Sequence, residues 1–334
     1  MKILVVRPGP QFSVEDVANG WIKGLKNVGH DVYEWDLGLR LEFFQQGFLA
    51  IKGSEATMEE VALNATAMLE AACWEQQPDI VLIITGYYLP PQFYDLARRL
   101  HKVILMVTES PYEDDRHLLQ AKHCDAVIVN DTRNLEKFNE ICPTFYYGHG
   151  YDPEIHKPGP GSLELISEFC FVGTGFPERI EFLEKIDWSH LIARLAGNWQ
   201  ALDATSPLLQ LVENDIADCI DNKDAVTLYQ SSLVSANLYR KQHTYSTDGH
   251  SCGPREIEMA ACGLFFLRET RPESDSLFPM LPTFTTPQEL QDGIHYWLNH
   301  PEERQKRAEK ARLAVADRTF DLLAEAFTSD LKTL

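Results

Sequence analysis

The stretch IVLIITGYYLPPQFYDLARRLHKVILMVT, residues 80–108, decides the fold class. It holds two short apolar runs, at 80–85 and 103–108, with an amphipathic segment at about 91–100 between them. Short apolar runs bounded by turn residues are typical of buried strands, and a connection of this length is typical of a helix that joins two parallel strands. The stretch therefore predicts an α/β protein built on a parallel sheet.

The first half of the chain repeats this alternation. The other predicted elements are strands at 3–6, 31–35 and 126–130 and helices at 14–28, 57–76 and 132–140. Parallel sheets bind ligands at the carboxyl ends of their strands. The candidate ligand-facing segments are therefore those that follow the strands, at 7–11, 86–88, 109–112 and 130–131.

A change of composition separates the two halves. Residues 151–162 (YDPEIHKPGPGS) hold three prolines and two glycines without periodicity, which is typical of a linker. We place a first Rossmann-like domain at 1–155, a linker at 156–165 and a second Rossmann-like domain at 166–334, facing across a cleft. The last helix is a candidate to pack back on the first domain. The second half is predicted to hold strands at 169–175, 191–195, 233–238 and 264–268, and helices at 178–186, 223–230, 287–299, 301–316 and from 254.

The composition excludes several classes of protein. The net charge of −20 and the scattered Lys and Arg residues argue against an extended surface for duplex nucleic acid. No apolar run approaches the roughly 20 residues that span a bilayer, so no membrane partner is expected. The N-terminus leads directly into a strand, without a cleavable signal, and we expect a cytoplasmic protein.

Cysteine and histidine do not form a recognisable metal pattern. The seven cysteines are an odd set without a CxxC pair, which argues against a disulfide framework. His243, His250, Cys252 and Cys262 lie near one another in the chain, but their spacing fits no standard zinc site. We therefore expect no bound metal.

The segment Ser251–Gly263 (SCGPREIEMAACG) is the most distinctive candidate site. Gly253 followed by Pro254 predicts the start of a helix, whose N-terminus offers unpaired N–H groups and a positive dipole end to a phosphate. Arg255 in the first turn adds a forked cation, and Glu258, one turn later, is suited to ribose hydroxyls. The structural alternative is an ordinary helix with an Arg255–Glu258 surface pair.

Other candidates for phosphate contact follow two strands of the second half. FVGTG (171–175) runs from a strand into a loop whose small residues allow close approach of a ligand, and a second predicted strand ends just before a Tyr-Arg pair. The residues concerned are Gly173, Thr174, Arg179, Tyr239 and Arg240.

These stretches, taken together, resemble the CgeB-like branch of the GT-B glycosyltransferases, a group-one-like family that includes spore maturation proteins. The resemblance runs in collinear order over most of the chain and is poorest at 200–222. The stretches that carry it include PDIVLIITGYYLPPQFYDLARR, VILMVTESPYEDDR, CDAVIVNDTRN, YYGHGYDPEIHKP, FVGTGFPERIEFLE, SANLYR, GPREIEMAACGLFFLRETRPE and YWLNHPEERQKRAEKAR.

The resemblance implies transfer of a sugar from a nucleotide donor to a hydroxyl of an acceptor held mostly by the first domain. The acceptor itself, whether a protein, a glycan, a small molecule or a modified nucleobase, stays open. By the same analogy, Gly173 and Thr174 lie beneath the donor diphosphate, and Glu258 holds the ribose. Arg179, Arg240 and Arg255 neutralise the diphosphate, so no metal or other cofactor is expected besides the nucleotide-sugar co-substrate.

The catalytic step is less defined. Many retaining GT-B enzymes have an acid eight residues before the equivalent of Glu258, where this chain has His250, so retention and inversion both stay open. Inversion needs a base within reach of the acceptor hydroxyl. Glu109 is our candidate, with Asp16 and His149 as alternatives and a helix-capping or structural role as the competing interpretation. A sugar-nucleotide epimerase or hydrolase, and a non-catalytic donor-binding protein, are the alternative functions.

Overall fold

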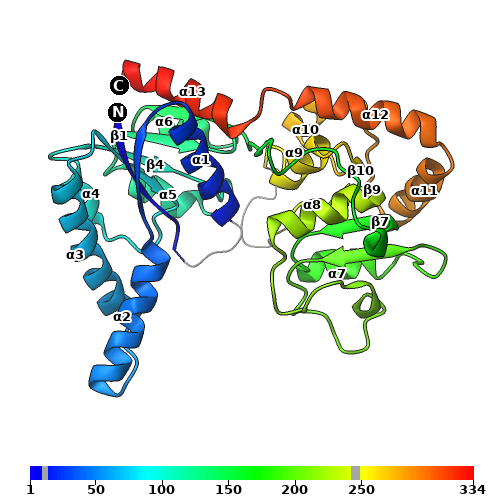
Figure 1. The fold of residues 1–334 in the computed structure, drawn as a ribbon, viewed down its shortest axis with the longest axis horizontal. Coiled ribbons are helices and arrows are strands. Elements are labelled where there is room, and N and C mark those ends of the chain that lie inside the picture. Colours follow the sequence, from blue (N-terminus) through cyan, green and yellow to red (C-terminus); the bar gives the residue numbers. More distant parts are fainter. Residues whose placement is uncertain (10–13, 242–248) are drawn as a thin grey trace. The chain divides into compact units, whose positions relative to one another are not determined.

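The computed structural model describes residues 1–9, 14–241 and 249–334, which form two compact units. Unit 1 comprises Met1–Gly148 and Phe320–Leu334, and unit 2 comprises His149–Thr319. Each unit contains one parallel sheet (Figure 1). None of the helices in the described ranges is long and apolar enough to cross a membrane.

Unit 1 is built on a six-stranded parallel sheet of order β2-β1-β3-β4-β5-β6. Its elements are β1 (Lys2–Val6), α1 (Glu15–Asn27), β2 (Asp31–Trp35), α2 (Leu37–Lys52), α3 (Met58–Gln76), β3 (Ile80–Ile84), α4 (Pro91–Ala97), β4 (Lys102–Met106), α5 (Asp114–Ala121), β5 (Ala126–Val129), α6 (Leu135–Asn139), β6 (Thr144–Tyr146), α13 (Phe320–Asp330) and the 3₁₀ turn η4 (Leu331–Thr333).

Both faces of this sheet are covered, which explains why its strands are continuous apolar runs. Side chains alternate between the faces of a strand, so Leu4 and Val6 join one buried cluster while Ile3 and Val5 join another. All five residues of β3 are buried. The quoted stretch thus forms the predicted strand, helix and strand as β3, α4 and β4.

The last helix, α13, packs against α1 within unit 1 (Figure 1). Gly24 permits this contact, because a Cβ there would lie 2.5 Å from the Phe320 carbonyl oxygen. Side chains of Phe320 and Phe327 then pack edge-on against Trp21. Two helices distant in sequence therefore share one hydrophobic cluster.

Unit 2 is built on a four-stranded parallel sheet of order β10-β9-β7-β8, with its own core. Its elements are η2 (Leu163–Leu165), β7 (Ser167–Val172), α7 (Pro177–Leu183), β8 (Ala193–Ala196), η3 (Leu209–Leu211), α8 (Asn222–Ser231), β9 (Ser232–Asn237), α9 (Pro254–Ala261), β10 (Phe265–Arg268), α10 (Pro272–Leu277), α11 (Pro287–Leu298) and α12 (Pro301–Ala314).

The units divide at Gly148/His149, whereas the composition suggested a first domain ending at 155 and a linker at 156–165. The proline-rich segment contacts unit 2: the Gln230 amide donates to the Lys157 carbonyl (2.7 Å), and the Ser162 N–H donates to Ser231 Oγ (2.8 Å). Proline and glycine indicate a loop, but they do not indicate whether other elements pack against it.

Candidate functional site

The N-terminus of α9 is built as its sequence suggests. Gly253 is the N-cap with extended backbone, and Pro254 occupies the first helical position. Glycine has no side chain that could accept an N–H of the first turn. The reverse contact of a capping box is present, because the Glu256 carboxylate accepts the Gly253 N–H at 2.8 Å. The preceding loop is held by Glu273, whose Oε2 accepts the Cys252 N–H at 2.7 Å. The helix therefore begins at a fixed point.

Glu256 connects α9 to the loop after β9 and to α10. The side chain is fully buried, and its carboxylate accepts from the Tyr239 hydroxyl and from Ser274 Oγ, each at 2.6 Å, besides Gly253. Burial raises the pKa of this carboxyl, while the hydrogen bonds from Ser274 and Tyr239 oppose the shift. Sequence reasoning missed Glu256 because it concentrated on residues exposed to a ligand.

We expect Glu256→Gln to change how stability depends on pH. A carboxyl whose pKa is raised in the folded state contributes stability that is present below its unfolded pKa and lost as pH rises through the folded pKa. The advantage of the wild type over Glu256→Gln in free energy of unfolding should therefore be larger at about pH 5 than at about pH 8. Urea unfolding at both pH values measures it, and an equal difference would contradict the assignment.

Arg179 joins the loops after β7 and β9. Its guanidinium donates from Nη1 to the Thr174 carbonyl (3.0 Å) and from Nη2 to the Leu238 carbonyl (2.5 Å). The sequence suggested that Arg179 neutralises a diphosphate, and the structure adds that its guanidinium braces two loops. Two cations lie beside the ring of Phe176 at this edge of the sheet. The guanidinium carbon of Arg179 is 5.2 Å from the ring centroid, and that of Arg240 is 4.8 Å from it.

Tyr239 is held on both its backbone and its ring. Its N–H donates to Glu269 Oε2 at 2.7 Å, and the Arg271 guanidinium lies 3.7 Å from the ring centroid. The side chain is nine-tenths buried and its hydroxyl is bonded to Glu256. Tyr239 thus fixes the β9 loop relative to α9.

Gly173 and the following residues form a loop in close contact with the end of β8. The Gly173 N–H donates to the Ala196 carbonyl at 2.9 Å. Gly197 has a φ of +118°, and a Cβ on it would lie 2.6 Å from the Gly173 carbonyl oxygen. A side chain at 197 would therefore both strain its own backbone and displace the Gly173–Thr174 loop.

Gly197→Ala should destabilise unit 2 by about 2 kcal/mol or more, because a side chain at positive φ adds to the steric clash. Gly263→Ala is the matched variant: its φ is +76°, but the nearest atom to an added Cβ is Pro158 Cγ at 3.4 Å. Chemical denaturation should show the larger loss for Gly197→Ala. Equal losses would show that strain alone matters at position 197.

Arg255 and Glu258 form an ion pair, with Nη1 and Oε2 2.7 Å apart. The Glu258 side chain is 9% exposed and that of Arg255 is 30% exposed. This is the surface pair that the sequence left as an alternative, although it is more buried than a typical surface pair. Tyr229 of α8 lies close by: it is buried, and its hydroxyl has no hydrogen-bond partner in the described part of the chain.

Asn237, the last residue of β9, is a second residue that sequence reasoning missed. It is 7% exposed, and a Cβ on Gly253 would lie 3.6 Å from its Oδ1. Within the described residues its amide nitrogen has no hydrogen-bond partner. A polar side chain beside a helix N-terminus at the carboxyl end of a strand is the signal that could have identified it.

Glu109 lies in unit 1, after β4, in a stretch fixed on both sides. Thr108 Oγ1 is 2.9 Å from Thr85 Oγ1, and the Ser110 N–H donates to Asn130 Oδ1 at 3.2 Å. Thr85 has a φ of +66°, which is unusual for a residue other than glycine. Such backbone strain often accompanies functional sites.

The remaining sequence candidates are spread over both units. Asp16 lies in the first turn of α1, and His149 is the first residue of unit 2. The His250 carbonyl accepts the Glu273 N–H at 2.9 Å, and Cys252 and Cys262 are buried. His243 lies outside the described residues. Among the described residues, no three His, Cys, Asp or Glu side chains form a group suited to a metal ion.

Comparisons with known proteins agree with this architecture. A family model described as "Glycosyl transferase-like" matches residues 179–323, a range that includes Arg179, Arg240, Arg255 and Glu258. The spore protein CgeB of Bacillus subtilis is 22% identical over 250 residues, which cover 70% of this chain and 76% of that protein. The chain is thus similar in sequence to CgeB, and its two parallel-sheet units have the GT-B fold.

Solved structures share this fold over nearly the whole chain. Sucrose-phosphate synthase from Thermosynechococcus elongatus superposes with a TM-score of 0.70 at 12% identity, covering 99% of each chain. Anabaena HepE, solved in complex with UDP-glucose, gives a TM-score of 0.63 at 14% identity and covers both chains fully. The predicted fold class of two Rossmann-like parallel-sheet domains is thus confirmed.

Proposed function

We propose that this chain is a glycosyltransferase that uses a nucleoside-diphosphate sugar, bound at the carboxyl edge of the unit 2 sheet. One observation carries the proposal: Arg179 joins the loops after β7 and β9, and Glu256 joins the β9 loop to the start of α9. These contacts hold a glycine loop, several cations and a helix N-terminus at one edge. A diphosphate requires such a combination of donors and positive charge.

The residues divide between ligand contact and support. Gly173 and Thr174 lie beneath the diphosphate, and Arg240 and Arg255 supply charge to it. Glu258 turns from Arg255 toward the ribose, and the Asn237 amide adds a donor beside Gly253. Arg179 and Tyr239 act mainly by holding the loops, a role supported by their contacts with backbone and with Glu256.

The reaction breaks the bond between the sugar and the diphosphate and forms a bond to an acceptor hydroxyl oxygen. The departing diphosphate gains negative charge, which the α9 N-terminus and the guanidinium groups stabilise without a metal ion. In an inverting reaction Glu109 accepts the proton of the acceptor hydroxyl. HepE, a structural relative, was solved with UDP-glucose, which supports a nucleotide sugar as co-substrate here.

A screen of UDP-, GDP-, ADP- and dTDP-sugars for thermal stabilisation tests the proposal. A donor present at 100 times its Kd should add about 2.7 kcal/mol to the free energy of unfolding, and so raise the melting temperature. Product analysis with that donor then separates transfer to acceptors from epimerisation or hydrolysis. Stabilisation without turnover over a broad acceptor panel would favour a non-catalytic binding protein, and no stabilisation by any donor would contradict the proposal.

A further inference from the structure

The helix α2 carries an apolar face on the side away from the core of unit 1. Leu37 and Leu41 are buried and join the core. On the opposite side, Leu39 and Phe43 are 56% and 61% exposed, and Ile51, near the end of the helix, is 87% exposed. The helix projects from unit 1 (Figure 1). Surface helices normally place polar residues on the outer side, and a contiguous apolar patch there marks an interaction surface.

The exposed residues belong to one row of the helix. Leu39, Phe43, Gly47 and Ile51 follow one another at a spacing of four, which is the spacing of the ridges by which helices pack together. Gly47 interrupts this ridge, because a Cβ built on it would meet nothing within 4 Å in the described part of the chain. Glycine is unfavourable inside a helix, and no contact in unit 1 requires it here. The ridge therefore has a notch at Gly47.

The ridge is complementary to a second copy of itself. When two α2 helices lie antiparallel about a two-fold axis level with Gln45, residues equally far from Gln45 on either side face one another. Phe43 of one copy then meets the notch at Gly47 of the other, and Leu39 meets Ile51. The symmetry makes each contact twice. Residues 43–51 (FFQQGFLAI) carry no charge, so no like charges oppose each other across the axis.

A hollow beside Leu39 provides space for the second copy. Its volume is about 560 Å³, and Leu39, Leu41 and Met58 form its apolar side. Arg7, on the other side, is already paired with a carboxylate at 3.0 Å. Ile51 of the second copy arrives at Leu39, the rim of this hollow. The most exposed apolar side chain of α2 thus meets an apolar recess.

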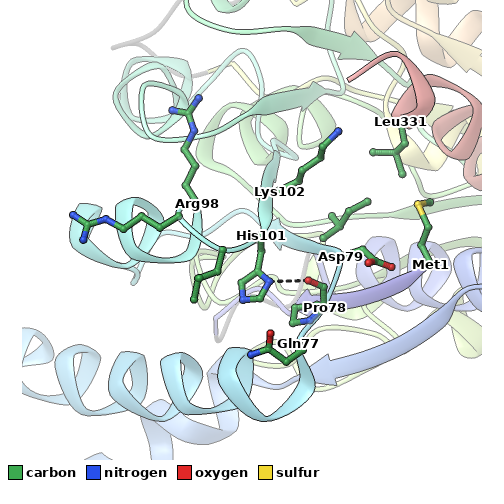
Figure 2. A pocket seen from close by; sticks show the side chains of 11 residues that line it. Met1, Gln77, Pro78, Asp79, Arg98, His101, Lys102 and Leu331 are labelled. Carbon is green, nitrogen blue, oxygen red and sulfur yellow. Dashed lines mark hydrogen bonds between the residues drawn. The ribbon is translucent and has the colours of Figure 1, made fainter.

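Another hollow of unit 1 does not suit an apolar side chain. It lies at the amino-terminal edge of the sheet and has a volume of about 780 Å³. The cations Arg98 and Lys102 are on its rim, and their side chains point apart (Figure 2). The recess beside Leu39 is therefore the better match for the apolar ridge of α2.

We propose that α2 forms a two-fold, antiparallel dimer interface with α2 of a second copy of this chain. Charge favours a protein over an anionic membrane, because residues 37–76 hold six glutamates and two cations, a net charge of −4. Leu39, Phe43, Leu49 and Ile51 together expose roughly 400 Å² per copy, taking about 150–200 Å² for a large apolar side chain. Two such faces and their polar flanks approach the roughly 1,200 Å² of the smaller specific interfaces, so the dimer is a reversible one.

Sedimentation velocity of the full chain at about 1 to 200 µM tests the proposal, since reversible dimers of this size dissociate in the micromolar range. The mass should rise with concentration from 38.0 kDa toward twice that value. A chain that stays monomeric over the whole range would overturn the dimer. Flotation with phosphatidylcholine vesicles, with and without phosphatidylglycerol, is the second arm. Binding of a monomeric chain to vesicles, abolished by Phe43→Glu, would assign the face to a membrane instead.

Gly47→Leu tests the notch without disturbing the fold. The added side chain enters open space and favours the helix, so the melting temperature should not fall. The dimer should weaken about 30-fold or more, because the overpacking occurs twice across the two-fold axis. Gln305→Leu adds the same side chain at an exposed position of α12 and should leave the dimer unchanged. A Gly47→Leu dimer as tight as the wild type, or equal weakening by Gln305→Leu, would contradict the interface.

Mixing two charged variants tests the antiparallel pairing. Leu39→Glu and Ile51→Lys should each weaken their own dimer, since a charge then faces an apolar residue at two places. In a mixture, the new carboxylate of one copy faces the new ammonium of the other, and a heterodimer should form more tightly than either homodimer. Leu39→Glu mixed with Ile51→Glu is the control and should form none. A mixture of the first two variants that associates no better than this control would overturn the antiparallel arrangement.

Discussion

Arg255→Ala is expected to weaken binding of the nucleotide-sugar donor by about 10- to 100-fold, the range for loss of a hydrogen bond to a charged group. Arg255 occupies the first turn of α9, where the helix dipole already favours an anion, and its side chain is the more exposed member of its ion pair. A diphosphate can therefore compete with Glu258 for the guanidinium. Isothermal titration with the donor found by thermal screening measures the change.

The control must separate loss of a phosphate contact from loss of an ion pair. Arg312→Ala on α12 removes a comparable pair, since Arg312 and Glu309 are also three residues apart with a 2.7 Å contact. It should leave donor affinity within about twofold, as surface pairs contribute little. Unchanged affinity in Arg255→Ala itself would show that the α9 N-terminus is not the diphosphate site.

Most of the fold could be predicted because its strands are short, apolar and flanked by turns. The predicted strand at 126–130 corresponds to β5 (Ala126–Val129), and the helix at 57–76 to α3 (Met58–Gln76). The helix α2 was missed, since apolar residues such as Phe43 and Ile51 occur all around it and remain exposed. Periodicity identifies a helix only when one face is apolar.

The places of the candidate residues in the fold were easier to predict than their contacts. Strand ends and a Gly-Pro helix start mark the edge of unit 2 in the sequence, and the structure places these residues there. Partners depend on contacts between residues far apart in the chain, such as Arg179 with the Leu238 carbonyl or Tyr239 with Glu256. No local pattern encodes such contacts, so the bracing role of Arg179 could not be anticipated.

Glu109 lies in a turn whose backbone is held by hydrogen bonds on both sides. The backbone carbonyl of Glu109 accepts the N–H groups of Tyr112 (2.8 Å) and Glu113 (3.2 Å), which fixes the turn that leads into α5. Thr108 and Ser110 on either side are tied to neighbouring strand ends. The backbone that carries the Glu109 side chain is therefore fixed, and a fixed point of attachment is what a positioned general base requires.

Glu109→Gln is therefore expected to lower kcat about 10²- to 10⁴-fold, the usual contribution of a general base, with little change in donor affinity. Asp115→Asn is the matched control: it neutralises an exposed carboxylate in the first turn of α5 and should leave kcat within about threefold, because exposed charges are screened. Steady-state rates and the anomeric configuration of the product, by NMR, measure the outcome. If Glu109→Gln forms an inverted product at an unchanged rate, the base is another residue, and Asp16 and His149 are the next to substitute. A product with retained configuration would remove the need for a base at this position.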